Sequence, residues 1–296
     1  MKRIVVDKTI GTNYLGYNSL ILLYHQICSY KGEKIELDFS NNRWFEANLC
    51  ALLGSIIFLV KKDMITVEFI GMSKSLIKIL ERNGFLNSNS CYQINNTDTV
   101  VSFKRFSNAQ DAAFNEYIMR ELISKSNFPK HSNKLGKKIS ESIFEIFENA
   151  KTHGRCEYIY TCGQHYPKKI PARLDITIVD IGQTIHKNVN DFFPYLPFNI
   201  TATESIVWAV EYGHTTKKGR TGGLGLSLIK EFLELNKGVL QIISSNGFWE
   251  YKNGIVNKKD LAKHFPGTIV NIEFNFDDIS YYQLNSEIDI DLNNIF

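Results

Sequence analysis

Hydrophobic and polar residues in the first hundred positions follow two different periods. Apolar side chains recur every second residue at 2–6, 34–39 and 64–70, which predicts strands. They recur at helical spacing at 14–30, 44–60 and 73–82, where Ser73 is placed to cap the last helix. Strands that alternate with helices are typical of βαβ units, so we expect a largely parallel sheet in this part.

The polar stretch 87–99 separates this part from a second pattern of elements. We expect a strand at 100–106, helices at 111–126 and 135–153, and four further strands, which we place at 157–162, 174–179, 239–244 and 268–274. The stretch 183–220 contains Pro194 and Pro197 and is interpreted as a long loop, and loops of this length are usually functional or disordered. The sequence therefore predicts an α/β protein with domains at 1–98 and 99–280 and an acidic tail at 281–296.

Composition narrows the class of protein. The chain has 296 residues, 44% of them hydrophobic and 22% charged, and a formal net charge of +3. This charge is too small to indicate a nucleic-acid or membrane surface, and the longest apolar run, 49–60, is shorter than the roughly 20 residues of a membrane span. Five cysteines without a CxxC pair are typical of reduced thiols. We expect a cytoplasmic protein.

The helix expected at 135–153 carries the first candidate chemistry. Glu145 and Asn149 are four residues apart, so both lie on one side of the helix, and His153 follows at the same spacing. An amide oxygen is a suitable neutral ligand for Mg²⁺, and a carboxylate one turn away can polarise a nucleophile. Each residue alone is more often part of a solvated helix face.

Two further segments suit a phosphorylated ligand with a flat base. The apolar strand LDITIVDI ends in Asp180, which can accept from an exocyclic amine, and Gly182 would let a base approach the backbone. Downstream, KKGRTGGLGLSLIK (217–230) places several glycines before a helix, where free backbone N–H groups bind anions. Lys217 adds positive charge there. Taken singly, the end of LDITIVDI is more often a turn that closes a strand, and a lone glycine-rich loop is weak evidence that a flexible turn also explains.

The order and spacing of the three segments resemble the N, G1 and G2 boxes of the GHKL ATPases, the superfamily of gyrase, Hsp90, histidine kinases and MutL. The resemblance covers about 111–274 and implies a Bergerat-type two-layer α/β sandwich with mixed sheet and helices on one face. It implies ATP and Mg²⁺ as cofactors, with Asn149 as the Mg²⁺ ligand and Glu145 as general base. It also assigns roles in nucleotide binding, which fall to Asp180, Gly182, Lys217, Gly222, Gly223, Leu224, Gly225 and Thr268.

The wording FENAKTHG is closest to the anti-sigma-factor serine kinases, although the DxGxG pattern lacks its second glycine at Thr184. The first hundred residues resemble a STAS domain, the fold of anti-anti-sigma factors. The family's phosphoacceptor would fall in 45–49, which has no hydroxyl. Either Glu46 supplies a permanent charge or the domain only docks, and we favour docking.

These resemblances imply a signalling regulator with serine-kinase-like or ATP-hydrolysing activity that controls a protein partner. An ATP-gated dimerising ATPase and a nucleotide-binding module with negligible turnover remain alternatives. We expect a protein partner, with a homodimer as one arrangement, and neither nucleic acid nor membrane.

Overall fold

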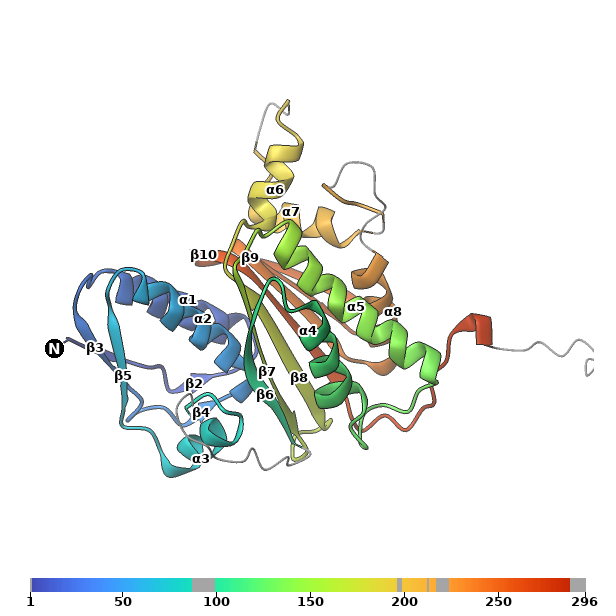
Figure 1. Ribbon diagram of the computed structural model, residues 1–296, viewed down its shortest axis with the longest axis horizontal. Coiled ribbons are helices and arrows are strands. Elements are labelled where there is room, and N and C mark those ends of the chain that lie inside the picture. The colour runs from blue at the N-terminus through green and yellow to red at the C-terminus, as the bar shows by residue number, and fades with distance from the viewer. Residues whose placement is uncertain (1, 87–98, 196–198, 212, 217–223, 288–296) are drawn as a thin grey trace, which may run out of the picture.

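The computed structural model describes residues 2–86, 99–195, 199–211, 213–216 and 224–287. The fold is mixed α/β and contains both parallel and antiparallel sheets (Figure 1). None of the helices in these ranges is both long and apolar enough to cross a membrane.

The N-terminal part contains the expected parallel sheet. Its strands are β1 (Lys2–Val5), β3 (Lys34–Asp38) and β5 (Thr66–Ile70), in the order β1-β3-β5. The helices α1 (Tyr14–Cys28) and α2 (Cys50–Lys61) connect them, and α3 (Lys74–Arg82) follows. The Ser73 side chain accepts from the backbone N–H of Leu76, which confirms the predicted cap.

The helix predicted at 44–60 begins later than expected. Trp44–Phe45 forms a short strand, β4, which pairs in parallel with β2 (Thr9–Ile10), and a 3₁₀ turn at Ala47–Leu49 precedes α2. Glu46 between them has an extended backbone, and its carboxylate accepts from the backbone N–H of Thr12 at 2.7 Å. Pairing with β2 therefore overrides the helical spacing of these apolar residues.

The second sheet has five strands in the order β6-β7-β8-β10-β9. The strands are β6 (Val100–Ser107), β7 (Tyr158–Tyr166), β8 (Arg173–Asp180), β9 (Val239–Lys252) and β10 (Ile255–Asn275). All four neighbouring pairs are antiparallel, so the expected mixed sheet is wrong for this part. A tight turn at Asn253 and Gly254 joins β9 to β10, and a longer hairpin loop, 167–172, joins β7 to β8. A hairpin can join only antiparallel strands.

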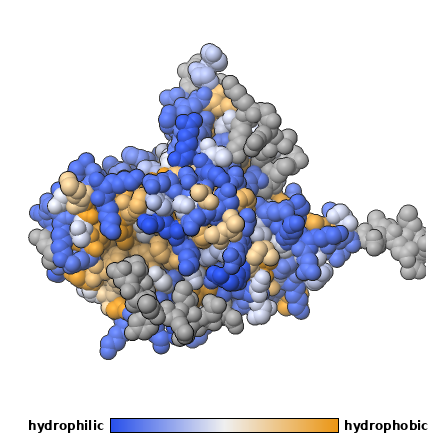
Figure 2. Space-filling view, viewed as in Figure 1, coloured by the Kyte–Doolittle hydropathy of each residue, from blue (hydrophilic) through white to orange (hydrophobic). Residues whose placement is uncertain are grey.

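Helices cover one face of this sheet, as Figure 1 shows for α4 (Asp111–Ile118), α5 (Asn133–Thr152) and α8 (Leu224–Asn236). A π-helical turn at Met119–Ile123 ends the helix predicted at 111–126 early. The stretch 183–220, which we expected to be a loop, contains two helices, α6 (Ile185–Phe192) and α7 (Ala202–Val210). In Figure 2 the projecting α6 is largely hydrophilic.

The opposite face of the five-stranded sheet is covered by α1 and α2 (Figure 1). Alternate residues of β8 and β10 therefore enter different cores: Ile178 and Val270 pack with α5, whereas Val179 and Ile269 pack with the N-terminal elements. The expectation of helices on one face holds only for the C-terminal elements. In the whole chain the sheet is the middle layer between two helical layers.

Buried polar contacts join the N-terminal part to the sheet. Asn48, fully buried, donates to the Thr177 hydroxyl at 2.9 Å and to Asn271 at 3.3 Å. The Glu46 carboxylate accepts from Arg173 of β8 at 2.9 and 3.0 Å and is only 3% exposed. The charge of Glu46 is therefore neutralised inside the molecule, which argues against its acting as a permanent charge toward a partner.

Candidate functional site

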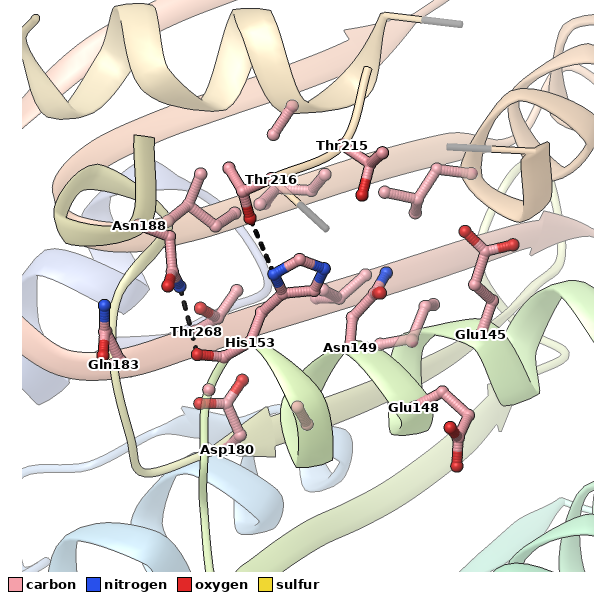
Figure 3. A pocket seen from close by; sticks show the side chains of 18 of the residues that line it. Glu145, Glu148, Asn149, His153, Asp180, Gln183, Asn188, Thr215, Thr216 and Thr268 are labelled. Carbon is pink, nitrogen blue, oxygen red and sulfur yellow. Dashed lines mark hydrogen bonds between the residues drawn. The ribbon is translucent and has the colours of Figure 1, made fainter. Parts of the chain in front are cut away.

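A cavity of about 340 Å³ lies at the end of the sheet from which α6 projects, between the sheet, α5 and the helices of the stretch 183–216. Its lining includes Glu145 and Asn149 from α5, Asp180 from the end of β8, and Thr268 from β10 (Figure 3). The segments that supply these side chains lie far apart in the sequence. The fold brings these four predicted site residues together.

The helix α5 orients Glu145 and Asn149 by burying its other side. Ser132 caps its start by accepting from the backbone N–H of Leu135, and a stripe of apolar residues packs in the core, namely Ile139, Ile143, Ile146, Phe147 and Ala150. In Figure 3 the side chains of Glu145 and Asn149 rise from the helix toward Thr215, whereas Glu148 points away. Glu148 accepts from Lys151 at 3.3 Å, as a solvated ion pair.

Asp180 is the most unusual group in the cavity. It is 7% exposed, and its Oδ1 has no hydrogen-bond partner among the described residues. Burial raises the pKa of this carboxyl from 3.8 to about 8, and a contact with the backbone of Thr268 offsets part of the effect. A buried oxygen without a donor is costly, so the site favours a ligand that brings an N–H group to Asp180.

Gly182 makes a close backbone contact that the sequence did not indicate. A Cβ at this position would lie 2.1 Å from the carbonyl oxygen of Gly154, so the backbone that approaches Gly182 closely belongs to the turn after α5. The neighbouring Gln183 N–H donates to the same Gly154 oxygen at 2.6 Å. The glycine therefore lets the end of β8 pack against the turn after α5, which places Asp180 beside Gly154.

We expected Thr268 to be the first residue of the last strand. It lies instead within β10, which begins at Ile255. It follows a register shift after Phe265 and pairs with Asp180 across the sheet. Its hydroxyl lies 3.0 Å from the hydroxyl of Ser244, which also accepts from the backbone N–H of Ile185 at 2.9 Å. The contacts of Ser244 were not predicted, because nothing in the local sequence pattern indicates that this residue joins two strands to the start of α6.

The described residues of 183–216, which we call the cover segment, form one wall of the cavity. Trp208 and His214 stack with ring centroids 4.9 Å apart and planes 19° apart, and both line the cavity. Phe192 and Phe193 contact Trp208, with ring centroids 5.8 and 5.5 Å away. These aromatic residues therefore pack with one another within the segment.

The predicted phosphate loop falls mostly outside the described residues. Lys217, Gly222 and Gly223 lie there, and Leu224 and Gly225 are the first two residues of α8. The described part of α8 therefore begins directly after the residues that lie outside the described ranges. The side chain of Leu226, in the first turn of α8, lines the cavity.

Acidic and amide groups dominate the polar lining. Three acidic residues, Glu145, Glu148 and Asp180, are among the lining residues, although the Glu148 side chain points away in Figure 3. None of the lining residues within the described ranges is lysine or arginine. No group of three His, Cys, Asp or Glu side chains in those ranges is arranged to hold a metal ion by itself. A cation at Asn149 would therefore need oxygen ligands from water or from a bound phosphate, as Mg²⁺ commonly has.

No family model matches this chain, and no curated protein matches it.

Proposed function

We propose that this chain binds ATP with Mg²⁺ in the cavity between α5, β8, β10 and the cover segment. The observation that carries the proposal is the convergence of Glu145, Asn149, Asp180 and Thr268 on one cavity. A volume of about 340 Å³ is in the range of small-molecule sites. The antiparallel sheet with α4, α5 and α8 on one face supports a Bergerat-type fold, and the β1-β3-β5 unit supports a STAS-like one.

Each group has a role that follows from its position. Asp180 accepts from the exocyclic amine of adenine, beside Thr268. Asn149 offers its amide oxygen to Mg²⁺, and Glu145, one turn earlier on α5, orients or deprotonates the attacking hydroxyl or water. Lys217 and the glycines at 222, 223 and 225 would neutralise and bind the phosphates. Gly182 contributes through the backbone packing that holds Asp180 in place.

We infer that the output is signalling: serine-kinase-like or ATP-hydrolysing activity that controls a protein partner. An ATPase cycle with dimerisation is the second candidate, and a module that binds without turnover is the third. Incubation with γ-labelled ATP and candidate partners separates the first two, because label appears on protein only when the phosphoryl group is transferred.

The binding proposal is tested by thermal shift of the full chain with ATP or ADP, with and without Mg²⁺. A ligand at 100 times its dissociation constant stabilises the folded state by about 2.7 kcal/mol, which raises the melting temperature by roughly 5 °C or more. Asn149→Ala should abolish the Mg²⁺-dependent part. Glu141→Gln, an exposed acid on the same helix, is the matched control and should leave the shift unchanged. No shift in the wild-type chain would refute nucleotide binding.

A further inference from the structure

Two residues of the cover segment form hydrogen-bond contacts with His153, at the C-terminal end of α5. One lies in α6, and the other is the last described residue of the segment. The side-chain amide of Asn188, near the start of the segment, donates to the His153 carbonyl oxygen at 3.2 Å. The hydroxyl of Thr216, at its described end, lies 2.8 Å from Nδ1 of the His153 ring. Figure 3 shows the two contacts leaving His153 in different directions.

The position of His153 explains why it can make both contacts. It is the C-cap of α5, so its carbonyl oxygen lies beyond the last intrahelical acceptor and is available to another group. Its own N–H donates to the carbonyl oxygen of Asn149 at 2.8 Å, which holds the ring one turn beyond the proposed Mg²⁺ ligand. The His153 ring itself lines the cavity.

The cover segment also encloses the cavity through residues other than the two that contact His153. Trp208, His214 and Thr215 belong to the lining, and so does Thr216 at the attachment itself. A molecule bound in the cavity is therefore held between α5 and this segment. Separation of the two must break the contact between His153 and Thr216.

We propose that His153 is a positioning residue that clasps the cover segment over a bound nucleotide and thereby sets how long the nucleotide stays. The inference rests on the proposed function, since it assigns to that same site a control of ligand release. His153 acts through Thr216 and Asn188 and takes no part in the chemistry. Because opening precedes release, loss of the clasp raises the dissociation rate constant and leaves association nearly unchanged.

The test is stopped-flow fluorescence with N-methylanthraniloyl-ADP and Mg²⁺ on the full chain. Thr216→Val removes the hydroxyl and keeps the shape of the side chain, so this variant tests the clasp with the least disturbance of the fold. We expect dissociation roughly 2- to 10-fold faster in Thr216→Val and in His153→Ala, the range that one hydrogen bond supplies. The double variant should be no faster than the faster single one, because both changes break the same contact.

Two controls separate positioning from general stability. His153→Asn keeps a polar nitrogen near the place of Nδ1 and should restore slow dissociation at least in part. His186→Ala, on the same segment but outside the cavity lining, should match the wild type. Single variants that dissociate at the wild-type rate, or single effects that add in the double variant, would overturn the clasp while leaving nucleotide binding intact. Failure of the wild-type chain to bind the probe would instead overturn the nucleotide assignment, and the clasp with it.

Discussion

Replacement of Asp180 by asparagine should weaken nucleotide binding and stabilise the empty protein at alkaline pH. The buried carboxyl has its pKa raised from 3.8 to about 8, so the folded chain holds a proton that the unfolded chain releases near pH 4. The protonated carboxyl of Asp180 therefore contributes its full stabilisation of the folded chain below pH 4. This contribution is lost as the pH rises to about 8. The wild-type protein should therefore become less stable over that range.

The size of the effect follows from the shift in pKa. One pKa unit is worth about 1.4 kcal/mol, so the change from 3.8 to about 8 amounts to on the order of 5 kcal/mol. Asparagine has nearly the same shape and does not titrate. The variant should therefore equal the wild type within about 1 kcal/mol near pH 4.5 and exceed it by several kcal/mol at pH 8.5.

The same substitution removes the oxygen that accepts from the proposed base. Asparagine keeps the contact with the Thr268 backbone N–H through its amide oxygen and so turns its NH₂ group toward the amine of the base. Two donors that face each other without an acceptor cost about 1–3 kcal/mol, so ATP affinity should fall roughly 10- to 100-fold. Urea unfolding at pH 4.5 and 8.5 measures stability, and calorimetric titration at pH 7.5 measures affinity. Glu141→Gln serves as control in both. A variant that is no more stable than the wild type at pH 8.5, or that binds ATP as tightly, would contradict this view of Asp180.

Four other substitutions test separate parts of the argument. Asn149→Ala should lower ATP affinity in Mg²⁺ at least 10-fold and leave the weak metal-free binding unchanged, measured by calorimetric titration with and without chelator. Glu145→Gln should keep ATP affinity within about threefold and reduce phosphoryl transfer or hydrolysis by about 10²-fold or more, followed with γ-labelled ATP. Gly182→Ala forces a Cβ against the Gly154 carbonyl oxygen and should cost about 1–3 kcal/mol in urea unfolding. Glu46→Ser should lower stability by about 1–3 kcal/mol, because Arg173 loses a buried partner, and the introduced hydroxyl should take up no label from γ-labelled ATP.

Local patterns predicted the elements that carry the site. The helical stripe of α5 and the apolar strand ending at Asp180 depend on nearest-neighbour periodicity, which the sequence states directly. The strand at Trp44–Phe45 could not be predicted in this way, because two apolar residues fit both periods and the pairing with β2 decides between them. The antiparallel direction of the second sheet depends on how the connections close, which periodicity does not encode.

The start of helix α7 could have been predicted from the sequence. The prolines at 194 and 197 led us to expect a loop there instead. Thr201 and Glu204 form a capping box, in which each side chain bonds the backbone N–H of the other, and the T-x-x-E pattern is visible in the sequence. The contacts of His153 with Thr216 and of Ser244 with Ile185 join residues about 60 positions apart. No local pattern indicates them, so these parts of the site required the three-dimensional structure.

The two faces of the second sheet separate the proposed chemistry from the N-terminal part. Along β8, Asp180 and Ile178 face the cavity, whereas Thr177 on the opposite face holds Asn48. The stretch 45–49, where the STAS resemblance places a phosphoacceptor, is packed against that opposite face by Glu46 and Asn48. A phosphoryl group at Glu145 would have to cross a fully packed sheet to reach it. If the chain is a kinase, the stretch 45–49 of the same molecule is therefore not its acceptor, and the acceptor must reach the cavity from the side of α5 and the cover segment.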